Sequence, residues 1–198
     1  MLPSHLSASA VVALASDPAT FARRLRRPMP SEPAVAARRG TAFHAWVEQH
    51  YGSAALVDVD ELPGFFDEEP ATDDALPRLK ENFLASEWAA RTPLDLEVSV
   101  ETVVAGYAIR GRIDAVFARA DGAVTVVDWK TGARPDAATL RHRSLQLATY
   151  ALAYARLKGL DPAMVDGAFF YAASGETYRP PMQTQREIEE LLVTATEG

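Results

Sequence analysis

Two strand-like runs joined by Asp121-Gly122 constrain the fold of this chain more than any other feature of its sequence. The runs are residues 107–118 (YAIRGRIDAVFA) and 123–130 (AVTVVDWK), and both are rich in the apolar and β-branched residues that favour strands. An Asp-Gly pair between two such runs is a strong signal for a tight β-hairpin turn. The sequence therefore predicts two adjacent antiparallel strands, and the rest of the chain must pack around them.

The segments around this hairpin predict further strands and helices. Residues 94–101 alternate apolar and polar side chains, beginning with Leu94, which indicates a strand with one buried face that completes an antiparallel meander. Another strand is predicted at residues 165–173, and helices are predicted at residues 6–27 (with a break at Asp17-Pro18), 41–51, 76–91, 144–158 and 184–195. We therefore predict an α/β (α+β) fold in which helices flank a mixed central sheet.

Two residues mark predicted helix ends. Thr41 belongs to a residue type that favours the N-cap, and a helix starting there has His44 in its first turn. Gly159 follows the helix predicted at residues 144–158 and fits a C-cap.

Composition narrows the class of protein further. With 198 residues, 48% of them hydrophobic and 24% charged, the chain is expected to fold as one domain over residues 1–198, with a helical part at 1–91 and a sheet with helices at 92–198. The absence of cysteine excludes disulfides, thiolate zinc sites and iron–sulfur clusters, so any metal must bind to oxygen and imidazole. No apolar run approaches the roughly 18 residues of a membrane span and no leader pattern begins the chain, so we expect a cytoplasmic protein with no membrane association.

The formal net charge of -7 argues at first sight against a nucleic-acid partner. The charge is unevenly distributed, however, because residues 58–74 hold eight carboxylates and no Lys or Arg, which leaves a net charge of +1 on the rest of the chain. Six arginines lie before residue 40. These runs can be solvated charge with no partner or the basic footprint of a DNA-binding protein, and composition leaves both open. We expect residues 58–74 to form an exposed loop.

Asp114 and Asp128 lie in the two strands of the predicted hairpin. If the turn centres on Asp121-Gly122, residues whose numbers sum to about 242 face each other, and these two aspartates satisfy that condition. The Cβ atoms of directly opposed residues are about 4.5–5.5 Å apart, and like charges at that spacing are destabilising unless a cation compensates them. Mg²⁺ and Mn²⁺ prefer carboxylate oxygens. The pair therefore predicts a metal site, the alternative being two solvent-facing aspartates on an exposed sheet face.

Lys130 and Glu97 are the candidates to complete this site. Lys130 follows Asp128 by two residues, so the strand repeat directs both side chains to the same face of the sheet. An ammonium group there can stabilise the attacking water or the charge that develops on a phosphate, or it can form only a salt bridge with Asp128. Glu97 lies on the polar face of the preceding strand, either as an additional active-site carboxylate or as an ordinary surface glutamate.

Four sequence motifs occur in a fixed order along the chain. They are Gly40-Thr41-Ala42-Phe43-His44, Gly111-Arg112-Ile113-Asp114, Val127-Asp128-Trp129-Lys130-Thr131-Gly132, and QLATY at residues 146–150. Each is weak alone, but their order and spacing are specific, and they span about 110 of the 198 residues. Together they resemble the RecB-like branch of the PD-(D/E)xK nucleases, a module often fused to bacterial helicases that process double-strand breaks. The resemblance implies a restriction-endonuclease-like fold.

The resemblance also implies roles for individual residues. It assigns metal ligation to His44, Asp114, Asp128 and the backbone carbonyl of Trp129. Lys130 takes the role of the catalytic lysine, and Gln146 and Tyr150 line the active site near the substrate strand. Without the resemblance, His44 reads as a structural histidine with its hydrogen bonds satisfied. Gln146 and Tyr150 share a helix face and otherwise read as the polar flank of an amphipathic helix.

The motifs predict a Mg²⁺- or Mn²⁺-dependent nuclease that hydrolyses phosphodiester bonds in DNA. The resemblance implies single-stranded DNA as the substrate and a helicase domain or subunit as the partner, and the lack of cysteine places the chain among members without an iron–sulfur cluster. Two alternatives stay open. One is a catalytically inactive DNA-binding or interaction module on the same fold; the other is hydrolysis of RNA, because these residues read the phosphate rather than the sugar.

Overall fold

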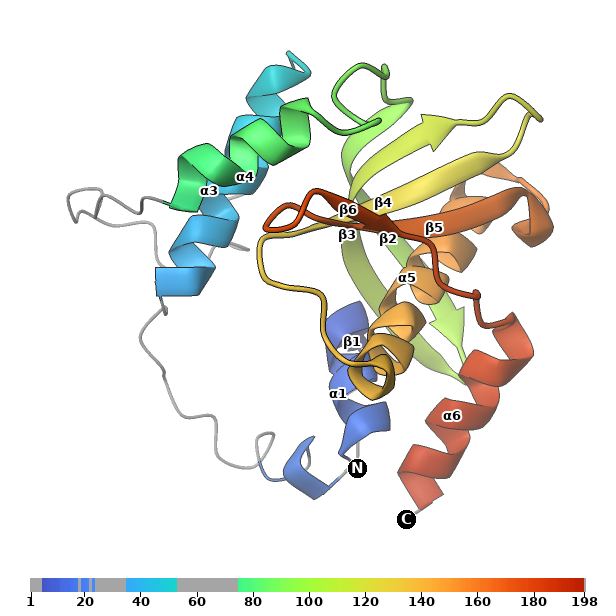
Figure 1. The fold of residues 1–198 in the computed structure, drawn as a ribbon. Helices are drawn as coiled ribbons and strands as arrows, with labels where there is room; N and C mark the ends of the chain where they lie inside the picture. Colours follow the sequence, from blue (N-terminus) through green and yellow to red (C-terminus); the bar gives the residue numbers. More distant parts are fainter. Residues whose placement is uncertain (1–4, 18, 22, 24–34, 53–74, 198) are drawn as a thin grey trace.

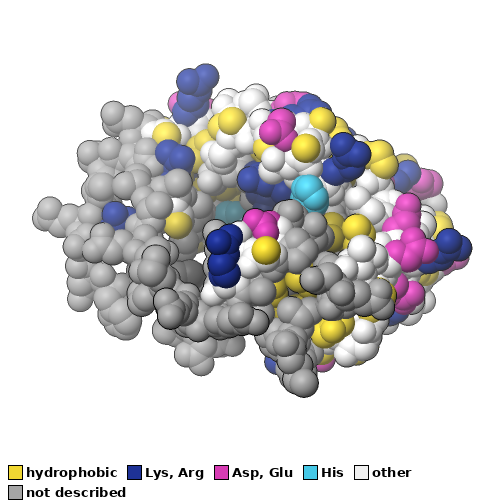
Figure 2. All heavy atoms as spheres, turned by 90° about the horizontal axis from the view of Figure 1, so that it is seen from below, with side chains coloured by type: hydrophobic (Ala, Val, Ile, Leu, Met, Phe, Trp, Pro, Cys, Tyr) yellow, Lys and Arg dark blue, Asp and Glu magenta, His cyan; other side chains and the backbone are white. Residues whose placement is uncertain are grey.

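The computed structural model describes the chain except for residues 1–4, 18, 22, 24–34, 53–74 and 198. The acidic segment 58–74 and part of the arginine-rich segment before residue 40 therefore lie outside the described residues. On the face seen in Figure 2, the described Lys and Arg side chains are interspersed with acidic and apolar ones.

A six-stranded mixed sheet forms the centre of the protein (Figure 1), which confirms the predicted fold class. Its strands are β1 (His5–Ser7), β2 (Asp95–Val104), β3 (Tyr107–Ala118), β4 (Val124–Lys130), β5 (Val165–Tyr171) and β6 (Glu176–Tyr178). β2, β3 and β4 form the predicted antiparallel meander, whereas β1 runs parallel to β3 and β5 runs parallel to β4. The predicted hairpin register is confirmed, because Ala115 pairs with Val127.

Helices cover both faces of the sheet (Figure 1). The helices are α1 (Ala8–Ser16), α3 (Val35–His50), α4 (Ala75–Leu84), α5 (Ala137–Lys158) and α6 (Gln185–Glu197), with a short 3-10 helix η2 (Pro162–Met164) before β5. α3 and α4 pack on one face through Phe43, Val47 and Phe83, and α5 packs on the other, where α1 and α6 cover it in turn. None of the helices in the described ranges is long and apolar enough to cross a membrane.

The first predicted helix is shorter than expected and is preceded by a strand. β1 pairs in parallel with β3, a contact between distant parts of the sequence that local periodicity does not encode. Ser7 then caps α1 by accepting a hydrogen bond from the amide of Ala10 (3.0 Å). The break predicted after the helix is confirmed, since α1 ends at Ser16 with Asp17 as its C-cap.

The prediction placed the start of the second helix too late in the sequence. α3 starts at Val35, and Thr41 is an interior residue whose hydroxyl donates to the carbonyl of Ala37 instead of capping the helix. The prediction was wrong because Gly40 suggested a break, although a glycine inside a helix is tolerated at a modest energetic cost. His44 therefore lies well inside α3 and not in its first turn.

The remaining boundaries differ for local reasons. α4 ends at Leu84, so the predicted helix at 76–91 is too long, and the short strand β6 is missing from the prediction. α5 begins at Ala137, where the Asp136 carboxylate caps the amide of Thr139 (2.8 Å); its first turns are largely exposed and carry little apolar periodicity. The predicted C-cap is confirmed, because Gly159 ends α5 with a φ of 66°.

Two strands, β1 and β4, pair with different parts of the same edge of β3, and the candidate site lies between those two parts. β1 pairs with residues 108–110 and β4 with residues 115–118, both on the edge opposite β2. Among the described strands, none pairs with the intervening residues 111–114 on that edge. The ring of Tyr150 from α5 lies so close to Gly111 that a Cβ at this position would clash with it. Gly111 thus permits α5 to approach residues 111–114 of β3.

Gly111→Ala is expected to destabilise the protein by about 1–3 kcal/mol, because the added methyl group must displace the buried ring of Tyr150. Urea unfolding measures the difference in the free energy of unfolding. In a Tyr150→Ala background the same change should cost less than half as much, since the clash is gone. Equal costs in both backgrounds would show that the ring is not the obstacle.

Candidate metal and active site

His44, Glu97 and Asp114 come together from α3, β2 and β3. One ligand atom from each side chain lies within 4.8 Å of those of the other two. His44 Nδ1 is 3.4 Å from Asp114 Oδ1, and His44 Nε2 is 3.2 Å from the backbone carbonyl oxygen of Trp129. Carboxylate oxygens and imidazole nitrogens are the donors that divalent cations take in proteins. The donor set of this group therefore fits a divalent metal ion.

The backbone of the neighbouring strand holds Asp114 in place. Asp114 Oδ2 accepts a hydrogen bond from the amide of Trp129 (2.7 Å), at the point where β3 and β4 part. The indole of Trp129 is 2% exposed and packs edge-on against Phe83 and Phe170, so the donating amide is anchored in the core. The other oxygen of Asp114 is left directed toward His44.

Glu97 lies opposite Asp114 in an unusual backbone conformation. The pairs on either side, Leu96 with Ala115 and Val98 with Ile113, put Glu97 across from Asp114 in register. Its φ is 48°, in the left-handed region that a non-glycine residue inside a strand rarely adopts. Such strain persists where the surroundings enforce it, and it clusters at functional sites.

Asp128 and Lys130 form a largely buried ion pair beside this group. Lys130 Nζ lies 2.5 Å from Asp128 Oδ2, and the two side chains are 25% and 8% exposed. Burial raises the pKa of Asp128, and the Lys130 charge opposes the rise. Burial lowers the pKa of Lys130, but the carboxylates of Asp128 and Asp114 together outweigh burial and raise it. The two side chains share a face, as predicted, and Asp128 directs its carboxylate at Lys130 outside the closely spaced group of His44, Glu97 and Asp114.

The charges of these side chains act on one another. Burial lowers the pKa of His44, but the carboxylates of Asp114, Glu97 and Asp128 outweigh burial and raise it to about 9. Burial raises the pKa of Glu97 to about 7, with Asp114 adding to the rise. Burial raises the pKa of Asp114, but the charge and hydrogen bond of His44, the Trp129 amide and the Lys130 charge together outweigh burial and lower it. The carboxylates thus favour a positive charge at the position of His44, and a bound cation would satisfy the same preference.

Gln146 and Tyr150 border the carboxylates from α5. Gln146 Nε2 donates a hydrogen bond to the Tyr150 hydroxyl (3.1 Å), and Tyr150 is 8% exposed. Burial raises the pKa of Tyr150, and the negative charge of Asp128 adds to the rise, which places the phenol near that carboxylate. The two predicted residues therefore lie on the side of the site that α5 closes.

Two further charged residues, which the motifs did not single out, reach the site. Arg112 Nε lies 2.6 Å from Glu97 Oε2, and it opposes the effect of burial on the pKa of Glu97. Glu48 adds to that effect, and its Oε1 is buried without a hydrogen-bond partner among the described residues. The signals are local: Glu48 follows His44 by one helical turn, and Arg112 lies within the Gly111 motif.

Comparisons with known proteins identify one family model and solved structures of the same fold. A family model described as the PD-(D/E)XK nuclease superfamily matches residues 5–197. Two solved structures share the fold: SSO0001, at 15% identity, 100% coverage of this chain and 77% of that chain, with a TM-score of 0.51; and a protein from Eubacterium rectale named as a candidate exonuclease, at 14% identity, 98% and 78% coverage, with a TM-score of 0.53. No curated protein matches the sequence. Because the family model spans nearly the whole chain, this protein belongs to the PD-(D/E)XK nuclease superfamily.

Proposed function

We propose that this protein is a metal-dependent deoxyribonuclease that hydrolyses phosphodiester bonds at the site described above. The observation that carries the proposal is the group of His44, Glu97 and Asp114, whose ligand atoms lie within 4.8 Å of one another. The ion pair of Lys130 and Asp128 lies beside that group. Membership of the nuclease superfamily supports phosphodiester hydrolysis as the reaction.

Some side chains of the site would bind the cation, and others would interact with the phosphate or the substrate strand. The closely spaced group of His44, Glu97 and Asp114 would hold Mg²⁺ or Mn²⁺, with Asp128 and the Trp129 carbonyl as neighbouring oxygen donors. When bound, such a cation polarises a phosphate oxygen and lowers the pKa of a coordinated water. Lys130 would stabilise the negative charge that develops on the phosphate in the transition state. Gln146 and Tyr150 would orient the substrate strand from the α5 side.

We infer that the substrate is single-stranded DNA, supplied by a helicase domain or subunit during the processing of double-strand breaks. The support is the resemblance of the four motifs GTAFH, GRID, VDWKTG and QLATY to RecB-like nucleases. An inactive DNA-binding module is disfavoured, because a group of carboxylates repels phosphate unless a cation lies between them.

Cleavage of end-labelled oligonucleotides tests this function. With Mg²⁺ or Mn²⁺ the protein should degrade single-stranded DNA, cut duplex DNA of the same sequence more slowly, and lose both activities in EDTA. Binding of DNA without cleavage in either metal would support the inactive module and overturn the proposal. Degradation of RNA with DNA left intact would reassign the substrate.

Metal removal is expected to lower the thermal stability of the protein. A ligand that binds only the native state stabilises it by about 2.7 kcal/mol at 100 times its Kd, and the unfolded chain does not bring His44, Glu97 and Asp114 together. Calorimetric scans in Mn²⁺ and in EDTA measure the difference. Glu97→Gln should reduce the Mn²⁺-dependent rise, whereas Glu101→Gln, half-exposed on the same strand, should keep it. A wild-type midpoint that Mn²⁺ does not change would contradict the site.

A further inference from the structure

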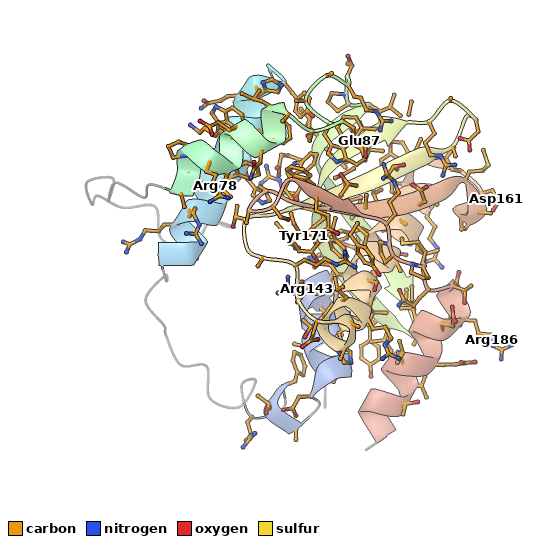
Figure 3. All side chains as sticks on the ribbon, in the orientation of Figure 1. Arg78, Glu87, Arg143, Asp161, Tyr171 and Arg186 are labelled. Carbon is orange, nitrogen blue, oxygen red and sulfur yellow. The ribbon has the colours of Figure 1, made fainter. Side chains whose placement is uncertain are left out.

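Arg143 lies on the face of α5 that borders the active-site carboxylates. It precedes Gln146 by three residues and Tyr150 by seven, spacings that put all three side chains on one side of the helix. Figure 3 shows Arg143 on α5 near Tyr171, in the interior of the view, whereas Arg186 points outward from α6. Arg143 is half-buried. A guanidinium group is thus available on this side of the site.

Tyr171 connects Arg143 to the strand that carries the catalytic lysine. It ends β5 and pairs in register with Lys130 of β4. Its side chain is 0% exposed, and its hydroxyl has no hydrogen-bond partner of good geometry in the described part of the chain. Burial raises the pKa of the hydroxyl, and the adjacent Arg143 guanidinium opposes the rise. The phenol oxygen can accept a guanidinium N–H, so it is placed to hold Arg143 in position.

Arg143 differs from Lys130 in having no carboxylate of its own among the described residues. Lys130 forms its ion pair with Asp128, whereas no described carboxylate lies within 4.0 Å of the Arg143 guanidinium. The two cations lie near each other, because Lys130 pairs in register with Tyr171 and Figure 3 shows Arg143 near Tyr171. A half-buried cation without a counter-charge, beside a second cation, is suited to bind an anion.

We propose that Arg143 binds a backbone phosphate of the substrate strand adjacent to the phosphate that is cleaved, and that Tyr171 is the positioning residue that holds its guanidinium. The inference rests on the proposed function for the identity of the strand and adds the residue that fixes it. A guanidinium suits this task because it can bind two phosphate oxygens at once. Since the phosphate it contacts does not react, Arg143 should affect KM more than kcat.

Fluorescence anisotropy with the full chain and a labelled single-stranded oligonucleotide tests the proposal, with Ca²⁺ as the cation and the salt concentration varied. Arg143→Gln should weaken binding about tenfold and reduce the slope of log affinity against log salt by about 0.7, the value for one phosphate contact on a single strand. Arg143→Lys should keep the slope, because the charge remains. Tyr171→Phe should weaken binding in the wild-type background and have no further effect in Arg143→Gln.

The matched control is Arg186→Gln, which removes one positive charge from a side chain 84% exposed on α6. If Arg143→Gln binds DNA with the affinity and salt slope of Arg186→Gln, the inference is overturned, while cleavage by the wild type still supports the nuclease. If the wild type does not cleave, the nuclease proposal fails, whereas a binding loss specific to Arg143→Gln still supports the phosphate contact. Additive effects of Tyr171→Phe and Arg143→Gln would overturn the positioning role.

Discussion

Asp114→Asn is expected to remove metal binding and DNA cleavage together. Asp114 has one oxygen bound to the Trp129 amide and the other directed at His44, so its second oxygen is the one available to a cation. Asparagine can still accept from the Trp129 amide, but it then presents an NH₂ group in place of that oxygen. Loss of a residue that only supports a metal ligand costs about 10–100-fold, so loss of the ligand itself should reduce kcat/KM by at least about 100-fold.

Initial rates on single-stranded DNA and calorimetric titration with Mn²⁺ measure the two effects of Asp114→Asn. The matched control is Asp121→Asn at the hairpin turn, where the side chain is 56% exposed and pairs with Arg119. That variant should bind metal and cleave like the wild type. Full Mn²⁺ uptake by Asp114→Asn would remove Asp114 from the ligand set.

Lys130→Met should abolish most of the cleavage while leaving metal binding intact. Methionine fills a similar volume without the charge, so the phosphate loses an electrostatic partner in the transition state, an effect typically worth about 10²–10³-fold in kcat. The Asp128 carboxylate loses its ion-pair partner at the same time, which leaves it free to interact with a cation. The combination of low kcat and retained Mn²⁺ affinity distinguishes this variant from Asp114→Asn.

Lys158→Met provides the comparison for the lysine variant, because Lys158 is 40% exposed at the end of α5 and pairs with Asp95 away from the carboxylate group. Its kcat should match the wild type. An unchanged kcat in Lys130→Met would mean that Lys130 serves only to neutralise Asp128.

The hairpin could be predicted from sequence because its determinants are local. Asp121-Gly122 sets the turn, the turn sets the register, and the register brings the strand positions of Asp114 and Asp128 to the same level of the sheet. The two-residue spacing likewise predicts that Lys130 and Asp128 share a face, and they form an ion pair. Strand β1 was not predicted, because it depends on pairing with β3, which is distant in the sequence. The start of α5 was predicted too late, because its first turns lack an apolar periodicity.

Glu97 shows why the rest of the site was harder to predict. Strict alternation places Leu94 and Val100 on one buried face, yet Leu94 precedes β2 and is 54% exposed while Val100 is 5% exposed. The left-handed φ of Glu97 interrupts the pleat between them, and no propensity rule anticipates such a conformation for glutamate. Its proximity to Asp114 follows from the register of β2 with β3, whereas its proximity to His44 follows only from the packing of α3 on the sheet.

Tyr171 and Arg143 illustrate the same limit for residues outside the motifs. Tyr171 reads as an ordinary apolar strand residue, because nothing in its neighbours indicates what its hydroxyl meets. Only the parallel pairing of β5 with β4, together with α5 across the same face, brings it to Lys130 and Arg143.

Anomalous diffraction from crystals grown with Mn²⁺ tests the central claim most directly. We expect one strong manganese peak enclosed by His44, Glu97 and Asp114, lost in crystals of Asp114→Asn, and its coordination will establish whether Asp128 and the Trp129 carbonyl also bind. Manganese found only at exposed carboxylates elsewhere, with these three side chains in contact with water alone, would contradict the account.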